Sequence, residues 1–367
     1  MPDVLMVADT LRSPELRHEV PIPIGDPFFY AERDGKRYVF VSSLEVPRLI
    51  ELDGLATIPL EELGVDELIA AGVRRPEADP ELMLRAAHRV GVSRAVVPRT
   101  FPLEVGDHLR AHGVEVESDG PLFDARRRAK TGVELDGIKR ALRASERAMA
   151  RVRERLRGGG RVTSEELRTE IARVFTEAGI ASPDLPIVSH GAQTAVGHEP
   201  GHGPVAPGEP LVVDIFPQDS ESGCFSDMTR TFCLGEPPAE LVEYQRLCRE
   251  ALDRVYAAIR PGVTGAELHR LACEVFEAAG QRTQLTKRPG EILDEGFYHS
   301  LGHGVGLEVH EAPALGRGGE ELVVGDVVAV EPGCYRQGFG GCRLEDLVLV
   351  TNDGCEVLTD FPYDLEV

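Results

Sequence analysis

Hydrophobic and polar positions change their spacing near residue 130, and the stretches on either side predict different elements. Before that point, short β-prone runs are broken by Pro and Gly, and the clearest are Tyr38–Leu44, Ala95–Pro98 and Val114–Val116. Residues Glu81–Val90 instead have the apolar spacing of a helix. Together these elements predict a small α/β domain in the first part of the chain.

The end of this first domain is marked by turn-forming residues. We interpret residues 118–123 (SDGPLF) as a boundary. The stretch that follows, Asp124–Lys130, contains three consecutive arginines, which we interpret as a solvated approach to a helix rather than a binding patch. The sequence therefore predicts two domains, residues 1–125 and residues 126–367.

Two capping boxes predict helix starts after residue 130. In each, a threonine is followed three residues later by a glutamate, so that side chains and backbone satisfy each other's hydrogen bonds. The boxes are Thr131 with Glu134, which open a long amphipathic helix ending at Gly158, and Thr163 with Glu166, which open a helix ending at Gly179.

The second domain contains an internal repeat. The words VTSEEL (162–167) and VTGAEL (263–268) are offset by 101 residues (263 − 162). Farther along, GEPLVVD (208–214) parallels GDVVAVE (325–331). Several matches in the same order indicate a duplicated helix–helix–strand unit. Because there are only two copies, they build one pseudo-symmetric domain and not a solenoid.

The charge of the chain excludes several classes of partner. It has 40 Lys and Arg against 62 Asp and Glu, a net charge of −22, which disfavours nucleic acid and anionic membrane surfaces. No apolar run approaches the ~18 residues of a membrane span, and the first residues lack the features of a signal peptide. The seven cysteines, an odd number all after residue 223, do not suggest a disulfide framework. We therefore expect a reduced, cytoplasmic protein.

Each copy of the repeat places one carboxylate at the end of an apolar strand. These are Asp214 in LVVDIF and Glu331 in VVAVEPG, and Asp227 and Glu345 follow 13 and 14 residues later. A strand, a turn and a returning strand bring residues at that spacing side by side. A strand-end carboxylate taken singly is better explained by a hydrogen bond to the backbone. Four carboxylates facing one centre, however, require cations or protons, and divalent metals prefer such oxygen ligands.

Histidines add nitrogen donors to the same centre. Three of them lie within twelve residues among glycines that let the backbone approach a site closely, and a fourth precedes the first strand-end carboxylate: His299, His303 and His310, with His198. A single histidine is usually a surface or hydrogen-bonded core residue, but this grouping favours a site. An imidazole among carboxylates is compatible with Mn, Co, Fe or Zn.

These residues and their flanking words resemble a known family. The ordered set resembles the five metal ligands of the pita-bread metallopeptidases, which include methionine aminopeptidase, aminopeptidase P and prolidase: Asp214, Asp227, His303, Glu331 and Glu345. The words SDMTRTF, GHGVGLEVHE, VEPGCY and GCRLEDLVLVT resemble its proline-specific branch. The resemblance covers the chain from about residue 130 to the end. It implies an α+β fold, with a pita-bread catalytic domain preceded by a smaller α/β domain of the creatinase type.

The resemblance also implies a role for each ligand. Asp214 would chelate one metal, Asp227 and Glu345 would bridge both, and His303 and Glu331 would complete the second. Glu331 would also accept a proton from the attacking water. The two ions, with Mn favoured over Co, Zn or Fe, would share that water and lower its pKa.

Four further side chains have implied roles. They are His310 at the scissile carbonyl, His198 on the leaving-group side, His299 as a site histidine and Arg343 as the support of the last ligand. His190 and His202 compete with His198 for the leaving-group role. The gap from Asp214 to Asp227 is longer than the family usually has, but an insertion of two residues preserves the strand register. Cys224 takes a position where an aromatic residue is common, and we interpret it as inert core.

The activity implied by the resemblance is hydrolysis of peptide bonds with proline on the leaving side. An Xaa-Pro dipeptidase is slightly favoured over an Xaa-Pro aminopeptidase, acting on small peptides as a homodimer. Three alternatives stay open: a metal-free creatinase-like hydrolase, a lyase on the same scaffold, and a non-catalytic binding protein. Retention of all five ligands argues against the first and the third.

Overall fold

The computed structural model describes residues 2–367, apart from the side chains at positions 75 and 76. It divides the chain into two units, Met1–Arg127 and Arg128–Val367. In those described residues, no helix combines the length and the apolar character needed to cross a bilayer.

A six-stranded mixed sheet forms the centre of the first unit, in the order β4-β3-β2-β1-β5-β6. Its strands are β1 (Val4–Ala8), β2 (Phe28–Arg33), β3 (Lys36–Val41), β4 (Leu55–Pro59), β5 (Arg94–Val97) and β6 (Glu115–Ser118). The three strands predicted from the sequence correspond to β3, β5 and β6. The predicted α/β character of this region is confirmed.

Helices cover both faces of that sheet. They are α1 (Pro14–Glu19), α2 (Val46–Leu49), α3 (Val65–Ala70), α4 (Arg75–Val90), α5 (Leu103–Ala111) and α6 (Gly120–Arg128), with the 3₁₀ turn η1 (Leu60–Leu63). One core contains side chains of α4 and α5, and the other contains side chains of α1, α2 and α6. Helix α4 begins six residues before the predicted start, because Ala78 adds a buried position one turn before Leu82.

The interpretation of the arginine run as solvated is wrong. Arg126 pairs with Glu32 at 2.8 Å, and Arg128 pairs with Asp326 at 2.6 Å. The side chains of Arg126, Arg127 and Arg128 are only 17%, 5% and 14% exposed. The physical reason is the burial of the carboxylates, since Glu32 is 8% and Asp326 0% exposed and each needs a counter-charge.

Four helices frame the second unit in two pairs: α7 (Gly132–Arg157), α8 (Ser164–Ala178), α9 (Ala239–Ala258) and α10 (Gly265–Ala278). Both predicted capping boxes are present at the starts of α7 and α8, and those helices end beside Gly158 and Gly179 as predicted. A third box, Thr264 with Glu267, opens α10 at the position equivalent to that of α8. The repeat seen in the sequence therefore extends to the helix caps.

Two antiparallel sheets lie between the helix pairs, in the orders β11-β9-β8 and β14-β13-β15-β18-β19. Their strands are β8 (Ile187–His190), β9 (Pro210–Ile215), β11 (Met228–Cys233), β13 (Gly302–Gly304), β14 (Glu311–Leu315), β15 (Val327–Val330), β18 (Asp346–Val350) and β19 (Cys355–Val357). Shorter elements complete the unit: β7 (Ile180–Ala181), η2 (Gly191–Ala195), β10 (Gln218–Asp219), β12 (Glu295–Gly296), β16 (Gly333–Arg336) and β17 (Gly340–Arg343).

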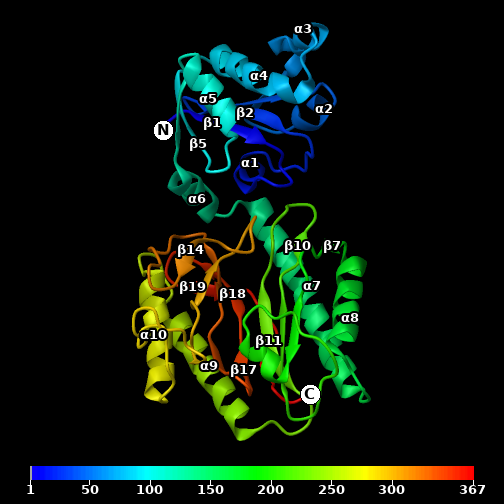
Figure 1. Ribbon diagram of the computed structural model, residues 1–367, viewed down its shortest axis with the longest axis vertical. Coiled ribbons are helices and arrows are strands. Elements are labelled where there is room, and N and C mark those ends of the chain that lie inside the picture. Colours follow the sequence, from blue (N-terminus) through cyan, green and yellow to red (C-terminus); the bar gives the residue numbers. More distant parts are fainter. Residues whose placement is uncertain (1) are drawn as a thin grey trace. The chain divides into compact units, whose positions relative to one another are not determined.

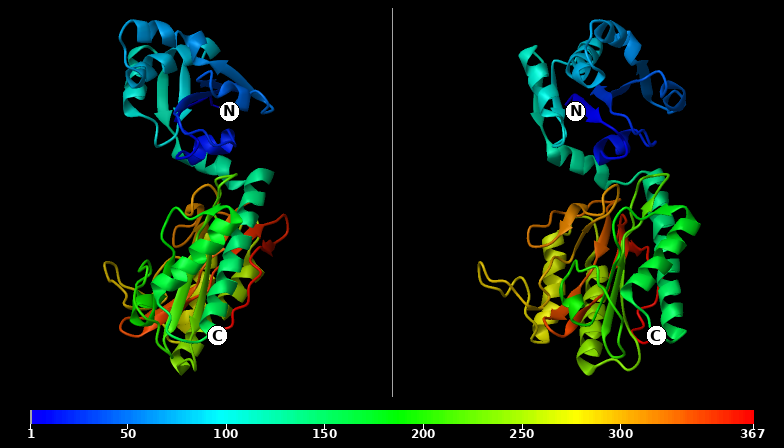
Figure 2. Two further views of the ribbon diagram at one scale, coloured as in Figure 1. Left: turned by 90° about the vertical axis from the view of Figure 1, so that its right-hand side faces the viewer. Right: turned by 45° about the vertical axis from the view of Figure 1, so that its right-hand side comes forward.

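The helix pairs cover the strands from two sides (Figure 1). Helices α7 and α8 share a core with β8, β9 and β11, whereas α9 and α10 share a core with β16, β17 and β18. Figure 2 shows α7 and α8 lying in front of the strands when that side of the unit is turned toward the viewer. The pseudo-symmetry is visible in the strand order, because β8-β9-β11 and β13-β15-β18 each place a middle strand between two antiparallel neighbours.

Candidate metal centre

The first pair of carboxylates stands on the β9–β11 hairpin. Asp214 in β9 is the partner of Thr229 in β11, and Asp227 directly precedes β11. Residues two apart along a strand face the same side, so Asp227 and Thr229 share the side on which Asp214 lies. The hairpin therefore presents both carboxylates on one side, although its turn is long.

The second pair stands at the equivalent places in the other copy of the repeat. Glu331 directly follows β15, and its backbone N–H donates to Leu301 O at 2.8 Å. Glu345 directly precedes β18, and its backbone N–H donates to Thr229 O at 3.1 Å. This last hydrogen bond crosses from one copy of the repeat to the other, and so it brings the two pairs of carboxylates together.

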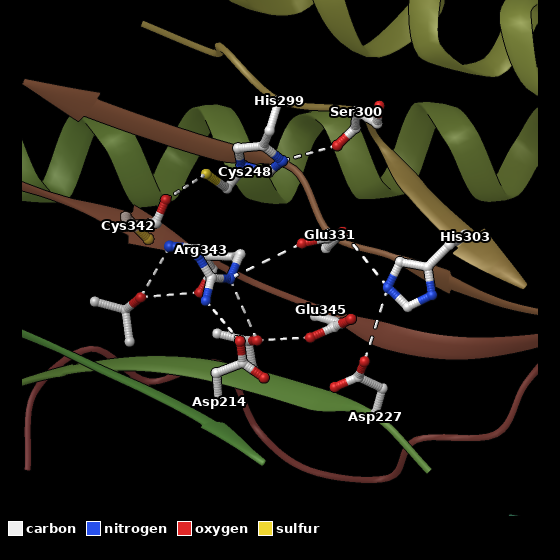
Figure 3. Close-up of polar contacts among 12 residues, drawn as sticks. Asp214, Asp227, Cys248, His299, Ser300, His303, Glu331, Cys342, Arg343 and Glu345 are labelled. Atoms are coloured by element: carbon white, nitrogen blue, oxygen red, sulfur yellow. Dashed lines mark hydrogen bonds and ion pairs between the residues drawn. The ribbon is translucent and has the colours of Figure 1, made fainter. Parts of the chain in front are cut away.

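The imidazole comes from the middle of β13. Nδ1 of His303 lies 3.2 Å from Gly304 O, and because a carbonyl only accepts, Nδ1 carries the hydrogen. Nε2 therefore has a free lone pair. It lies 3.8 Å from Asp227 Oδ2 and 3.7 Å from Glu331 Oε1, beyond hydrogen-bond length (Figure 3). The nitrogen that metals bind thus faces a carboxylate from each copy of the repeat.

The donor atoms of these side chains fall into three overlapping groups. Within each group the atoms lie within 4.8 Å of one another, and the groups are Asp214, Asp227 and Glu345; His303, Glu331 and Glu345; and Asp227, His303 and His310. The tertiary structure therefore brings all five predicted ligands to one place. His310 adjoins them, with its ring 4.1 Å from that of His303.

Unpaired oxygens within this cluster show what it can bind. Oδ1 of Asp214 and Oδ1 of Asp227 are buried and have no hydrogen-bond partner among residues 2–367. A buried carboxylate oxygen without a donor is costly, and the His303 lone pair directed at carboxylates adds repulsion. Divalent cations would offset both costs, and four carboxylates with one imidazole suit Mn, Co, Fe or Zn. The residues present thus fit a metal centre.

Burial changes the acidity of the cluster strongly. It raises the pKa of Glu331 to about 8, with Arg343 opposing and Asp214 adding to that rise. Burial, followed by the charge of the nearest carboxylate, also raises the pKa of Asp227 and of Glu345 well above the usual range. Burial lowers the pKa of the His303 imidazole to about 3. In the absence of metal, protonation of Asp227, Glu331 and Glu345 is therefore favoured, and the His303 imidazole is neutral.

The cluster opens into a cavity of about 820 Å³. All nine candidate site residues line it: Asp214, Asp227, His303, Glu331, Glu345, His198, His299, His310 and Arg343. The two histidines that compete with His198 are used elsewhere. His190 contacts Glu209 at 2.8 Å and His202 O at 3.0 Å, and the His202 side chain is 74% exposed beside Glu199.

Arg343 holds the first ligand directly and reaches the last one indirectly. Its Nη2 donates to Asp214 Oδ2 at 2.6 Å, and its Nε lies 4.0 Å from Glu331 Oε2 (Figure 3). The link to Glu345 runs through Thr229, whose hydroxyl is 3.5 Å from Arg343 Nε and donates to Glu345 Oε2 at 2.6 Å. The arginine therefore supports more of the site than the last ligand alone.

A chain of hydrogen bonds also connects Arg343 to His299 through Tyr335. Arg343 Nη1 donates to the Tyr335 hydroxyl at 3.1 Å, which must then donate to His299 Nε2 at 3.0 Å. His299 Nδ1 in turn donates to Ser300 O at 2.8 Å. Both nitrogens of His299 are thus committed within the protein, and burial lowers the pKa of the ring to about 3. The His299 ring is therefore neutral, and its hydrogen bonds join it to Tyr335 and Ser300.

Tyr335 and Thr229 were missed by reasoning from the sequence. Each lies an even number of residues from a ligand, Tyr335 four after Glu331 and Thr229 two after Asp227, and strand alternation was the signal that could have identified them. Neighbouring glycines make room for the tyrosine, since a Cβ at Gly333 would lie 2.2 Å from the Tyr335 hydroxyl.

The seven cysteines are free, and six of them are buried. Burial raises the pKa of the Cys224 thiol to about 12, which agrees with its interpretation as inert core. Cys334 and Cys342 lie opposite each other in β16 and β17, against the core beneath α9 and α10.

An acidic pocket with one ligating imidazole, built between two copies of a helix–helix–strand unit, defines the metallopeptidase class of site. The model of metallopeptidase family M24 matches residues 136–352, and the chain belongs to that family. The match covers both copies of the repeat and all five candidate ligands.

Individual relatives are similar over shorter stretches. The chain is 34% identical to a probable dipeptidase, PepE, of Mycobacterium tuberculosis over 246 residues, 66% of this chain and 61% of that protein. It is 30% identical to an Xaa-Pro dipeptidase of Pyrococcus furiosus over 233 residues, 63% of this chain and 62% of that protein. The chain thus spans less than two thirds of the length of these relatives.

The fold is similar to that of solved structures over nearly the whole chain. The X-Pro aminopeptidase of Thermotoga maritima superimposes with a TM-score of 0.78, covering 99% of this chain and 97% of that one at 21% identity. The superimposed region includes both units of the present chain. The predicted α+β architecture, a pita-bread domain preceded by a smaller α/β domain, is confirmed.

Proposed function

We propose that this protein is a metal-dependent peptidase that hydrolyses peptide bonds with proline on the leaving side. The observation that carries the proposal is the convergence of five metal-ligating side chains, two of them with unpaired buried oxygens, in one cavity. The proline preference is supported by similarity to an Xaa-Pro dipeptidase of P. furiosus at 30% identity.

Each ligand has a place in the proposed centre. Asp214 would chelate one divalent ion, Asp227 and Glu345 would lie between two ions, and His303 and Glu331 would complete the second. Ions bound there lower the pKa of a water and polarise a carbonyl, which supplies a nucleophile and an electrophile at neutral pH. Mn is the ion we favour, and we further propose a cytoplasmic homodimer that acts on small peptides.

The side chains around the ligands supply proton transfer and positioning. Glu331 would accept the proton of the attacking water and pass it to the leaving nitrogen. His310, beside His303, would donate to the oxyanion as it forms, and His198 would face the leaving group. His299 is instead a positioning residue that holds Tyr335 and, through it, Arg343.

The cavity walls suit an apolar substrate group. They include the apolar and aromatic side chains Leu185, Ile187, Phe216, Tyr298 and Val309. Such walls fit a proline ring. The peptide bond before proline is a tertiary amide, so its nitrogen has no N–H that the site would have to satisfy. We favour a dipeptide substrate over a longer peptide, in line with the dipeptidase names of the relatives in sequence.

The test is hydrolysis of Ala-Pro, Ala-Pro-Ala and Ala-Ala with added Mn or Co, together with metal analysis of the purified protein. We expect cleavage of Ala-Pro, weaker cleavage of Ala-Pro-Ala, none of Ala-Ala, and complete loss of activity on chelation. Glu331→Gln should abolish cleavage in a folded protein, and the exposed Glu356→Gln should not. A protein without stoichiometric metal would instead be creatinase-like or a binding protein.

A further inference from the structure

A buried ion pair lies behind the loop that carries His310 and is not part of the ligand set. Lys130, just before α7, contacts the carboxylate of Glu311, the residue after His310. The two side chains are 3% and 2% exposed. A pair so deeply buried is poor at stabilising a fold, because desolvating both charges offsets their attraction. Its contribution must therefore be sought in what it holds in place.

The Glu311 carboxylate lies beneath residues 305–310, which form no helix or strand. It accepts a long hydrogen bond from Glu308 N at 3.4 Å. A Cβ at Gly306 would lie only 2.5 Å from Glu311 Oε1, so the backbone of this loop rests directly on the carboxylate. The Glu311 carboxylate therefore supports the loop at two points before His310.

Backbone hydrogen bonds hold the start of the loop. Val305 N donates to Val327 O at 2.8 Å, and Phe225 N donates to Gly306 O at 2.7 Å. Both hydrogen bonds precede the part of the loop that turns toward the metal ligands. After His310, Glu311 begins β14 and pairs with Gly304 of β13, and its side chain adds the ion pair with Lys130.

Lys130 is in turn attached to the second copy of the repeat. Its backbone N–H contacts Gly325 O at 3.4 Å, and Arg128 pairs with the fully buried Asp326 at 2.6 Å. These two contacts bind residues 128–130 to the turn that precedes β15, the strand leading to Glu331. The lysine thus reaches the His310 loop from an anchored backbone.

We propose that Lys130 is a positioning residue for His310, acting through the carboxylate of Glu311. The ion pair holds residues 305–310 so that the His310 ring keeps its place against His303. This inference rests on the proposed function, in which His310 stabilises the oxyanion. A displacement of about 1 Å at such a group reduces turnover by roughly 10- to 100-fold.

The first experiment compares Lys130→Met with Arg140→Met, which removes an ion pair to the buried Asp219 outside this segment. In Lys130→Met we expect kcat for Ala-Pro to fall roughly 10- to 100-fold with little change in KM and unchanged metal content. Arg140→Met should lower Tm while keeping kcat within about twofold. Equal losses of kcat in the two variants, or loss of metal from Lys130→Met, would overturn the inference.

A second variant distinguishes the loss of the ion pair from a general disturbance of the fold. Lys130→Met/Glu311→Gln removes both charges together and leaves an amide oxygen that can still accept from Glu308 N. It should recover part of the lost kcat, as coupled residues do in a double-mutant cycle. No recovery beyond the sum of the single variants would show that the two residues act independently, and the inference would fail.

A third measurement does not depend on catalysis. Two-dimensional NMR of ¹⁵N-labelled histidine rings in the metal-free protein should show shifted His310 signals in Lys130→Met and unshifted ones in Arg140→Met. If the wild type cleaves no Xaa-Pro bond, the proposed function fails and this comparison still decides the present inference. Unshifted His310 signals in Lys130→Met would refute the positioning role alone.

Discussion

The two copies of the repeat contribute unequally to the metal centre. Both place a carboxylate after the middle strand and another before the returning strand, Asp214 and Asp227 in the first copy and Glu331 and Glu345 in the second. The outer strands differ. Ser189 of β8 pairs with Val212, two before Asp214, and His303 of β13 pairs with Ala329, two before Glu331. Duplication thus accounts for the four candidate oxygen ligands, and a single divergent position accounts for the candidate nitrogen ligand.

The turns between the carboxylates have diverged as well. In the second copy the turn forms the β16–β17 hairpin, which carries Tyr335 and Arg343 into the site. In the first copy the turn carries Asp219, which accepts 2.8 and 3.0 Å hydrogen bonds from Arg140 of α7. One turn therefore supports the chemistry, whereas the other attaches a helix to the sheet.

The most severe test of this comparison makes the second copy resemble the first. His303→Ser should lose the ligand of the second ion, with a reduction in kcat greater than about 100-fold and a lower metal content by elemental analysis. Ser189→Ala, at the matching position of the first copy, should change both by less than about twofold. Full metal occupancy in His303→Ser would show that the imidazole is not a ligand.

Proton release on metal binding tests whether the carboxylates of the two copies act together. Because the pKa values of Asp227, Glu331 and Glu345 are raised in the metal-free protein, cations must displace protons. Metal affinity should rise about tenfold per pH unit for each proton released between pH 6 and 8, as titration calorimetry in buffers of different ionisation enthalpy would measure. An affinity independent of pH would contradict the buried cluster.

The same pKa shifts make the stability of the metal-free protein depend on pH. A carboxyl whose pKa is about 8 when folded and near its usual value when unfolded keeps its proton longer in the folded state. Its contribution to stability is complete below the unfolded pKa and is lost as pH rises toward 8. Thermal melts with chelator should therefore give a lower Tm at pH 8 than at pH 6, and added Mn should restore it.

Tyr335→Phe tests the hairpin that only the second copy places in the site. The substitution leaves Arg343 Nη1 and His299 Nε2 without their shared partner, at a cost of about 1–3 kcal/mol in stability. We expect kcat to fall about tenfold because Arg343 then holds Asp214 less firmly. Tyr38→Phe, in the first unit, is the matched control. An unchanged kcat in Tyr335→Phe would leave the hydroxyl with a packing role only.

The smallest effect is expected in the turn of the first copy. Arg140→Met removes the partner of Asp219, whose side chain is 5% exposed, and should lower stability by about 1–3 kcal/mol in denaturant unfolding. Because this turn supports a helix rather than the site, kcat should stay within about twofold of the wild type. A large loss of kcat with unchanged stability would mean that both turns serve catalysis.

Local signals in the sequence predicted much of this arrangement. Capping boxes need only residues three apart, and the ligand order needs only the strand-end pattern and its repetition. The fold class, the repeat and the convergence of the five ligands could therefore be anticipated. Strand alternation places Tyr335 and Thr229 on the side of the ligands, but their hydrogen bonds to His299, Arg343 and Glu345 could not be anticipated, because the partners lie on other strands and loops.

The sequence by itself determined where the helices with capping boxes begin, that a unit is duplicated and which residue types could bind metal. These are properties that can be read along the chain. Only the tertiary structure decided which charges are buried against which. Lys130 meets Glu311 across 181 positions, and His299 meets Tyr335 across 36. Likewise, Arg126 and Arg128, which the sequence analysis interpreted as solvated, pair with buried carboxylates. Burial and pairing depend on how distant segments pack, and no local pattern carries that information.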